Sequence, residues 1–345
     1  RSVYKRQAQR GACLLISGKV RKNMEFVVFA GVLLLLFIFM IVQELIQTKN
    51  QEKLFKKYLR ENYGKEPPKE YSLERFARLG SYLERHKEEK QLDDITWNDL
   101  GMDEVFRRID RTYSAAGEEY LYYTLRNISC GREALEHLEE VVNWLQEQEN
   151  IKVRIQLMMK RLGHLGKYSL YDYLDNLDYL GERSNRKIVL GNLLYLPFLL
   201  LLFVQPAMGT IGIVLCMLWH IMTYFREKKV IEPYIISFAY VLRLIDVCEE
   251  LEKQKIPVYR RELDELREVL KSLRELRRGA YWVMAGNQGK IGGNPLDILA
   301  DYLRMILHLD IFQFNRMLEK LRKKTGQVET MLAITGYLDM AISVG

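Results

Sequence analysis

The sequence predicts an all-α protein that carries three apolar segments long enough to cross a lipid bilayer. Only 7 of its 345 residues are proline, and its polar segments are rich in Leu, Glu, Lys and Arg, which favour helices. Leucines in the C-terminal half recur at intervals of three and four residues, the spacing of one helix face. Three stretches of about seventeen residues hold no charged residue.

The net charge of +7 does not indicate nucleic-acid binding, because it comes from the first 23 residues. They contain seven of the 52 Lys and Arg and no acidic residue, so the rest of the chain balances 45 basic against 45 acidic residues. The run VYKRQ at residues 3–7 is what a common transposase library adapter encodes when it is read in frame. We interpret residues 1–23 as a non-native leader and Met24 as the natural start; a genuine basic leader is the alternative.

The first apolar segment, residues 26–42, predicts a transmembrane anchor within residues 24–46. At ~1.5 Å per residue it reaches ~25 Å, near the lower limit for crossing a bilayer core of ~30 Å. No small-residue cleavage site follows it, so we expect an uncleaved anchor and not a signal peptide.

The second apolar block, residues 188–225, predicts a transmembrane helical hairpin. Its halves, residues 188–204 and 209–225, are joined at residues 205–208, where Pro206 and the adjoining Gly209 allow the chain to turn. A charged residue in either half would cost roughly 2.5–3.5 kcal/mol at the bilayer centre. The alternative is a buried core hairpin in a soluble protein, but such helices usually show a polar edge, which these almost lack.

The charged flanks of these segments predict a multi-pass protein of the inner (cytoplasmic) membrane, with the lipid bilayer as its partner. Lysines and arginines follow the anchor and stand at both ends of the hairpin, whereas the hairpin turn is uncharged. The positive-inside rule then places residues 47–187, and everything after residue 225, in the cytoplasm. The four scattered cysteines agree with a reducing compartment.

The segments outside the apolar stretches are predicted to be helical. Residues 47–95 form a charged helical linker region. In residues 111–127, Ser114 is a candidate N-cap, with Glu118 and Glu119 favouring the helix dipole. Gly117 begins a stripe, continued by Leu121 and Leu125, in which the glycine permits close approach of another backbone.

Four tyrosines in the same stretch raise the question of base stacking. They spread around the helix, beside two glutamates and without a basic cluster, so they cannot form one stacking platform. We predict instead that they belong to the core and its edges: Tyr113, Tyr120, Tyr122 and Tyr123.

After the hairpin, residues 232–253 predict a long amphipathic helix. In the next helix the apolar positions have coiled-coil spacing, but two heptads are too few for an independent dimer, so we expect antiparallel packing within the chain. The glycine-rich run at residues 286–295 lacks the pattern of a phosphate-binding P-loop. The seam leucines are Leu263, Leu266, Leu270 and Leu273.

No catalytic or metal-binding constellation is evident, so we expect this chain to be no enzyme by itself and to hold no cofactor or metal. The five histidines are dispersed. A packing role is favoured for His308 and Asp310. His220 lies inside a predicted span, which makes it a functional candidate by default, although a helix–helix hydrogen bond is the simpler account.

Two segments carry a resemblance to a known family. DRTYSAAGEEYLYYTLRN at residues 110–127, followed by REALEHLEEVVNWL at 132–145, resembles the start of the helical core domain of MutS-type DNA mismatch repair ATPases. TGYLDMAISVG at residues 335–345 resembles the family's helix that enters the ATPase domain. Glu119 stands where the family pattern has an arginine. The positions that match the pattern are Thr112, Ser114, Gly117, Leu121, Leu125, Arg132, Leu338 and Asp339.

The resemblance implies a membrane-anchored MutS-like protein whose helical core is split by the hairpin. Residues 96–187 would be the first part of the core, and residues 226–345 the core and lever helices that lead to an ATPase domain after Gly345. That domain would bind ATP and Mg²⁺ in the parent protein and form a homodimer. DNA binding by the parent is left open, as the charge of this chain does not support it. The alternative is a membrane-bound helical scaffold that recruits a protein partner without any ATPase.

Overall fold

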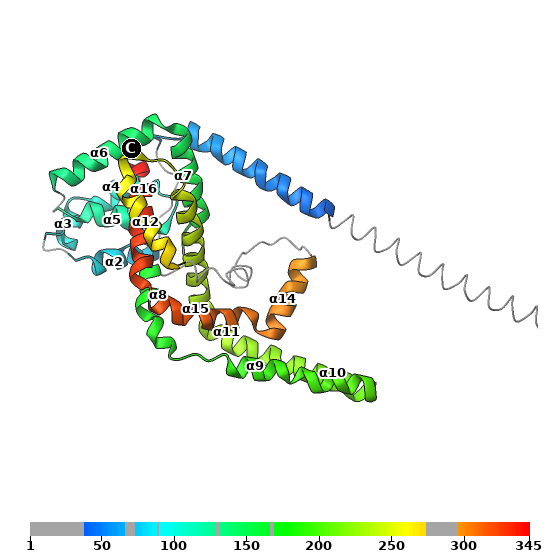
Figure 1. The fold of residues 1–345 in the computed structure, drawn as a ribbon. Helices are drawn as coiled ribbons and strands as arrows, with labels where there is room; N and C mark the ends of the chain where they lie inside the picture. Colours follow the sequence, from blue (N-terminus) through cyan, green and yellow to red (C-terminus); the bar gives the residue numbers. More distant parts are fainter. Residues whose placement is uncertain (1–37, 66–72, 88–89, 129–130, 166–168, 274–294) are drawn as a thin grey trace, which may run out of the picture. The chain divides into compact units, whose positions relative to one another are not determined.

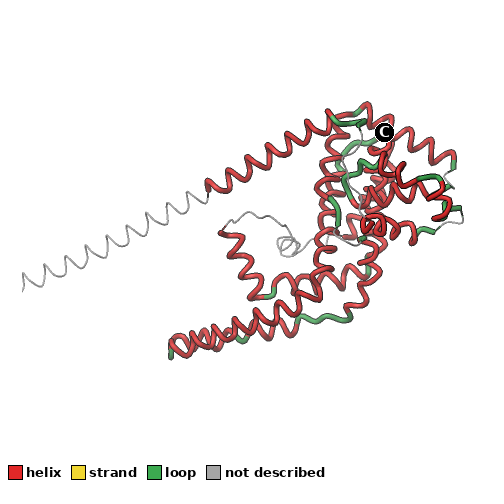
Figure 2. The backbone as a smooth tube through the Cα atoms, turned by 180° about the vertical axis from the view of Figure 1, so that it is seen from behind, coloured by secondary structure: helices red, strands yellow, loops and turns green. Residues whose placement is uncertain are grey.

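The structure is a computed structural model that describes residues 38–65, 73–87, 90–128, 131–165, 169–273 and 295–345. Figure 2 shows helices joined by loops, and the described residues contain no strand, which confirms the all-α prediction. The chain divides into two units, Arg1–Asn62 and Tyr63–Gly345.

In the first unit, residues 38–61 form one helix. Most of the predicted anchor, residues 24–46, lies outside the described residues. The helix runs without a break through position 46, where the anchor was expected to meet the linker region.

The described residues from Tyr63 to Leu180 form seven α-helices, which Figure 1 labels, and one 3₁₀ helix. Ser114 caps the fourth of these helices, as predicted, by accepting a hydrogen bond from the Gly117 amide. The elements are α2 (Leu73–Arg85), α3 (Asp94–Asp99), α4 (Met102–Ile109), α5 (Ala115–Arg126), α6 (Arg132–Glu147), α7 (Glu149–Leu162), α8 (Leu170–Asp175) and η1 (Asn176–Leu180).

The predicted hairpin is formed by α9 (Arg186–Leu193), α10 (Tyr195–Val204) and α11 (Pro206–Leu251). The chain reverses at Gln205 alone, because Pro206 occupies the first turn of α11, where no backbone donor is needed. A break at Leu194 separates α9 from α10; it lies beside Pro197, whose missing N–H removes the bond to residue 193.

Two helical stretches are long and apolar enough to cross a membrane, Arg186–Val204 and Pro206–Leu251. In the most apolar part of the first stretch no residue is buried. In the most apolar part of the second stretch 22% of the residues are buried. In a helix of a soluble core, most residues of such an apolar stretch would be buried. The two run antiparallel in close contact (Figure 1): a Cβ on Gly212 would lie 2.1 Å from the Phe198 ring, and one on Gly209 would meet the Leu202 backbone.

The C-terminal half of α11 belongs to the core of the second unit, so one continuous helix replaces the expected boundary at residue 225. It packs against α7, α12 and α16. Leu263, Leu266 and Leu273 of α12 are buried in this core, which gives the predicted seam a partner within the chain. The remaining elements are η2 (Pro257–Tyr259), α12 (Arg260–Leu273), α14 (Pro295–Leu307), α15 (Leu309–Arg322) and α16 (Thr325–Val344).

Candidate functional site: the junction of α5 and α16

The structure brings together two motifs that lie more than 200 residues apart in the sequence. The start of α5, with Ser114 and Gly117, packs against the last turns of α16, with Asp339. The two helices run antiparallel, because Gly336 lies near Tyr120 and Ser343 near Arg111.

Asp339 caps α5 from the neighbouring helix. Its buried carboxylate accepts hydrogen bonds from the Ser114 amide at 2.8 Å, the Ser114 hydroxyl at 2.6 Å and the Tyr113 amide at 3.1 Å. The Ser114 oxygen in turn accepts from the Gly117 amide at 3.1 Å. A carboxylate at a helix N-terminus satisfies amides that have no intrahelical acceptor and is favoured by the helix dipole. These bonds stabilise the buried carboxylate of Asp339.

One turn further along α16, Ser343 makes a second connection. Its hydroxyl donates to the Ile109 carbonyl at 2.7 Å and accepts from the Arg111 amide at 2.7 Å. Between the two connections, Asp110 accepts from the amide and hydroxyl of Thr112, and both side chains are fully buried. The segment that leads into α5 is thus fixed to one face of α16.

Glycines allow the close approach of the two helices. A Cβ on Gly117 would lie 2.3 Å from Asp339 Oδ2 and 2.6 Å from its Cβ, and a Cβ on Gly336 would lie 2.6 Å from the Ala116 carbonyl oxygen. Both positions must lack a side chain for the Asp339 bonds to form. The close approach predicted for Gly117 therefore has its partner in α16.

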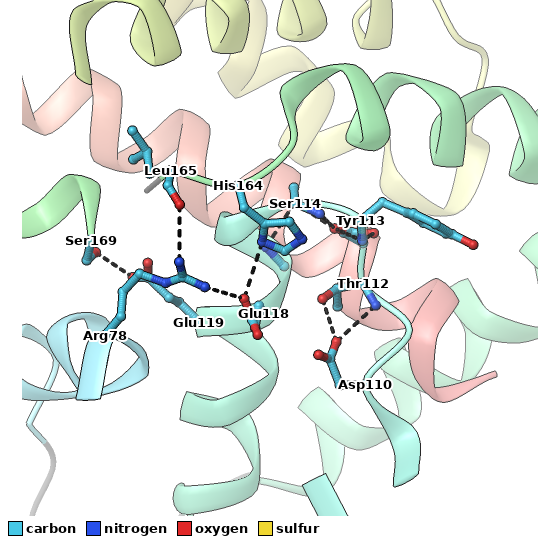
Figure 3. Close-up of polar contacts among 12 residues, drawn as sticks. Arg78, Asp110, Thr112, Tyr113, Ser114, Glu118, Glu119, His164, Leu165 and Ser169 are labelled. Carbon is cyan, nitrogen blue, oxygen red and sulfur yellow. Dashed lines mark hydrogen bonds and ion pairs between the residues drawn. The ribbon is translucent and has the colours of Figure 1, made fainter. Parts of the chain in front are cut away.

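On its other side, the first turn of α5 carries a buried ion pair (Figure 3). The Glu118 carboxylate accepts from Arg78 Nη2 at 2.9 Å and lies 3.3 Å from His164 Nδ1. Arg78 also donates to the Leu165 carbonyl at 3.1 Å. These bonds join α2 and the end of α7 to the start of α5.

The neighbouring Glu119 is buried without a cation directly bonded to it. The Ser169 hydroxyl donates to its carboxyl group at 2.9 Å. Burial raises the pKa of Glu119 to about 8, against the smaller lowering effects of Ser169 and Arg78. With a pKa of about 8, Glu119 holds its proton at neutral pH. Glu118 and Glu119 are both at most 3% exposed, so a substrate in solvent does not reach them and the pair is structural.

The remaining residues that match the family pattern lie in the core, at its edge or on the surface. Leu121 and Leu338 are buried in the core, and Leu125 packs at the edge of the same cluster as Leu121. Arg132 does not join the junction: its side chain is 91% exposed and pairs with Glu136 one turn away.

The tyrosines of α5 lie in aromatic packing and not in a stacking platform. Tyr122 is 8% exposed and its hydroxyl accepts from Arg126 at 2.6 Å. Tyr120 and Tyr123 contact the Tyr82 ring, and Tyr120 also meets Tyr337 of α16 edge to face.

Sequence reasoning missed the second half of this site. It assigned Glu118 and Glu119 to the helix dipole and gave no role to Arg78, His164 or Ser169. The available signal was the spacing, because Glu118 lies one turn after Ser114 and one turn before Tyr122, on a face that is otherwise buried. Its partners come from other helices, and no local pattern identifies them.

The comparisons with known proteins assign no family to this arrangement. No protein-family model, no curated protein and no solved structure matches the chain. Among the described residues, no three potential metal ligands lie together.

Proposed function

We propose that this chain is the helical core and lever of a membrane-anchored MutS-like protein, and that the α5–α16 junction couples a nucleotide-binding domain beyond α16 to the rest of the core. The observation that carries this proposal is the cap on α5 by Asp339. Seven of the eight residues that carry the resemblance are buried or partly buried, around this cap or on the helix faces beside it. An accidental match would scatter them.

The geometry suits a coupling element. A shift of α16 along its axis would move Asp339 and Ser343 together, and both are bonded to the segment that begins α5. Because α5 is also bonded through Glu118 to α2 and the end of α7, the displacement would spread to these two further parts of the core. Packed helices with discrete hydrogen-bonded positions transmit such shifts as units.

We further propose that α9, α10 and the first half of α11 form a hairpin that spans the inner membrane. Support comes from the outward-facing apolar side chains of these helices: Leu200 is 69% exposed, Phe203 89% and Val204 77%. Exposed apolar surface of this extent indicates contact with lipid or another apolar partner. Carbonate washing of membranes from expressing cells tests this part, since a spanning hairpin stays in the pellet.

The gene sequence downstream of codon 345 tests the coupling proposal. A GxxxxGK[ST] motif that follows a strand within roughly a hundred residues supports it, because that loop binds nucleotide phosphates. A stop codon close to codon 345 overturns it and favours the membrane-bound scaffold. As an independent check, the purified chain of 345 residues should hydrolyse no ATP.

A further inference from the structure

A cavity of ≈ 630 Å³ lies at the base of the hairpin, where its uncharged segments give way to charged flanks. The residues that line it come from the start of α9, from α11 around His220, and from α15 and the residue before it, His308. Trp219, which is 51% exposed, lines the same cavity. With the hairpin in a bilayer, as proposed above, this cavity lies at the level of the lipid headgroups, and the present inference rests on that proposal.

The cavity is lined by more basic than acidic side chains. Arg183 is paired with Glu227 at 3.3 Å. Arg186, Lys187 and Arg226 also line the cavity, and they form no ion pair with any residue that the structure describes. Unpaired cations beside the hairpin give the cavity a positive potential that attracts an anionic group.

Inside the cavity, His220 presents an unused ring nitrogen. The Thr223 hydroxyl shares its single hydrogen between the carbonyl oxygens of Trp219 and His220, at 3.0 and 2.9 Å. Because no hydrogen is left for His308, the Thr223 oxygen accepts from His308 Nε2 at 3.4 Å. Burial, followed by the nearby His220 ring, lowers the pKa of His308, whose neutral Nδ1 accepts from His220 Nδ1 at 3.3 Å. His220 Nε2 is therefore a buried acceptor without a partner among the described residues. A Cβ on Gly191 would lie 3.2 Å from this nitrogen, and the glycine leaves that space open.

A second unused acceptor follows from the same reasoning at Asn315. The Phe312 carbonyl can only accept, so Asn185 donates its Nδ2 to it at 3.0 Å and presents its Oδ1 to Asn315. Asn315 must then donate its own Nδ2, at 2.9 Å, and its Oδ1 has no partner among the described residues. Asn315 is 8% exposed and lines the cavity. Buried acceptors of this kind are costly unless a donor reaches them.

We propose that this cavity binds the headgroup of an anionic phospholipid that carries hydroxyl groups. Arg186 and Arg226 hold the phosphate, while the headgroup hydroxyls donate to His220 Nε2 and Asn315 Oδ1. The acyl chains lie along the exposed apolar side chains of α10 and α11. The lipid thereby fixes the hairpin to α15, which packs on the core side of the cavity.

Lipid titrations of the purified full chain in detergent, read by native mass spectrometry, test the headgroup chemistry. The probes are phosphatidylglycerol, phosphatidylmethanol (the same charge without hydroxyls) and phosphatidylcholine. We expect phosphatidylglycerol to bind about tenfold more tightly than phosphatidylmethanol, because only it satisfies the two acceptors. Equal affinity for the two anionic lipids overturns the proposal. Competition by glycerophosphoglycerol or inorganic phosphate at lipid-like concentration also overturns it, since the site would then serve a soluble phosphate.

Matched variants separate this cavity from general attraction to an anionic surface. The double variant Arg186→Gln/Arg226→Gln should weaken phosphatidylglycerol binding about tenfold or more. The control Lys229→Gln/Arg316→Gln removes the same charge from exposed positions outside the cavity and should leave the affinity within about twofold. Equal losses in both variants contradict the proposal. Asn315→Leu should reduce the preference for phosphatidylglycerol over phosphatidylmethanol.

A carbonate wash of vesicles that carry the reconstituted chain distinguishes the two proposals. Loss of the chain from vesicles of every composition overturns the membrane hairpin itself. Retention in all vesicles, without a preference for phosphatidylglycerol in the titrations, overturns only the headgroup site.

Discussion

The α5–α16 junction and the α10–α11 hairpin both bring two antiparallel helices together at glycines, yet they distribute polar and apolar groups in opposite ways. In the junction Asp339 is 1% exposed, and its carboxylate accepts hydrogen bonds from Tyr113 and Ser114 at the N-terminus of the neighbouring helix. In the hairpin the exposed groups are apolar, as with Phe203 at 89%. The first arrangement needs a dry interior that strengthens hydrogen bonds; the second needs an apolar surrounding.

Helix α11 belongs to both environments and shows the difference within one element. In its first half Met222 is 74% and Phe225 58% exposed, whereas in its second half Leu244, Cys248 and Leu251 are completely buried. No loop separates the two halves. A tilt of the hairpin would therefore reach the core directly, where α11 contacts α16.

Removal of the cap should have the largest effect on the stability of the core. We expect Asp339→Ala to lower the free energy of unfolding by about 3–4 kcal/mol, because it leaves two backbone amides and a hydroxyl buried without an acceptor. Urea unfolding of the full chain in mild detergent, followed by circular dichroism, measures this. Asp178→Ala removes a carboxylate that is 94% exposed and should cost less than about 0.5 kcal/mol. A similar loss of unfolding free energy in both variants would contradict the role of Asp339 as the cap of α5.

A charge placed in the hairpin should act on membrane insertion and not on the core. Leu196 lies near the middle of the first arm and is 53% exposed. Leu196→Arg should reduce insertion by about 2.5–3.5 kcal/mol, seen as a larger fraction of the chain released by carbonate. Tyr179→Arg, at a position 86% exposed outside the hairpin, should release none. An unchanged pellet fraction for Leu196→Arg argues that this arm does not lie in lipid.

The close approach of α5 and α16 predicts a steric penalty. Gly117→Ala should cost about 2–3 kcal/mol, since the new methyl group would overlap Asp339 and force the helices apart. The matched control is Gly80→Ala in α2, where nothing lies within 4 Å of the added Cβ; it should be neutral or stabilise by up to about 1 kcal/mol. A tolerated Gly117→Ala would show that the helices lie further apart than described.

Glu119 predicts the smallest effect, a pH dependence of stability. Its pKa in the folded chain is about 8 against a reference of 4.5, so between these values the folded state holds a proton that the unfolded state has released. Stability therefore falls as pH rises through this window, by about 1 kcal/mol between pH 6.5 and 7.5. Glu119→Gln should flatten that decline. Urea midpoints at several pH values test this, and an equally steep decline in the variant would assign it to another group.

The two regions also differ in how far the sequence predicts them. Composition alone predicts the hairpin, because two uncharged apolar segments of this length are typical of membrane-spanning helices and uncommon in other structures. The sequence also predicts the helix cap at Ser114 and the close approach of another backbone at Gly117, since both features depend on residues that are near in the chain. No sequence pattern identified Asp339 as the group that fills this space, because it lies in a helix more than 200 residues away; the resemblance gave it only as a position that matches the family pattern.

Two features lay beyond sequence reasoning for physical reasons. The ion pair of Glu118 with Arg78 joins helices whose contact depends on the packing of the whole unit. The continuity of α11 through residue 225 depends on tertiary packing that favours helix on both sides of Pro233, a residue that would otherwise suggest a break.

Cysteine labelling in intact bacterial cells tests the central claim most directly, with all four cysteines of the chain replaced. Gln205→Cys lies at the hairpin turn and Glu182→Cys before its first arm, and both positions are exposed. We expect a membrane-impermeant maleimide to label Gln205→Cys from outside and Glu182→Cys only after lysis, with the protein in the membrane fraction. Labelling of Gln205→Cys only after lysis, with the chain in the soluble fraction, would contradict the account.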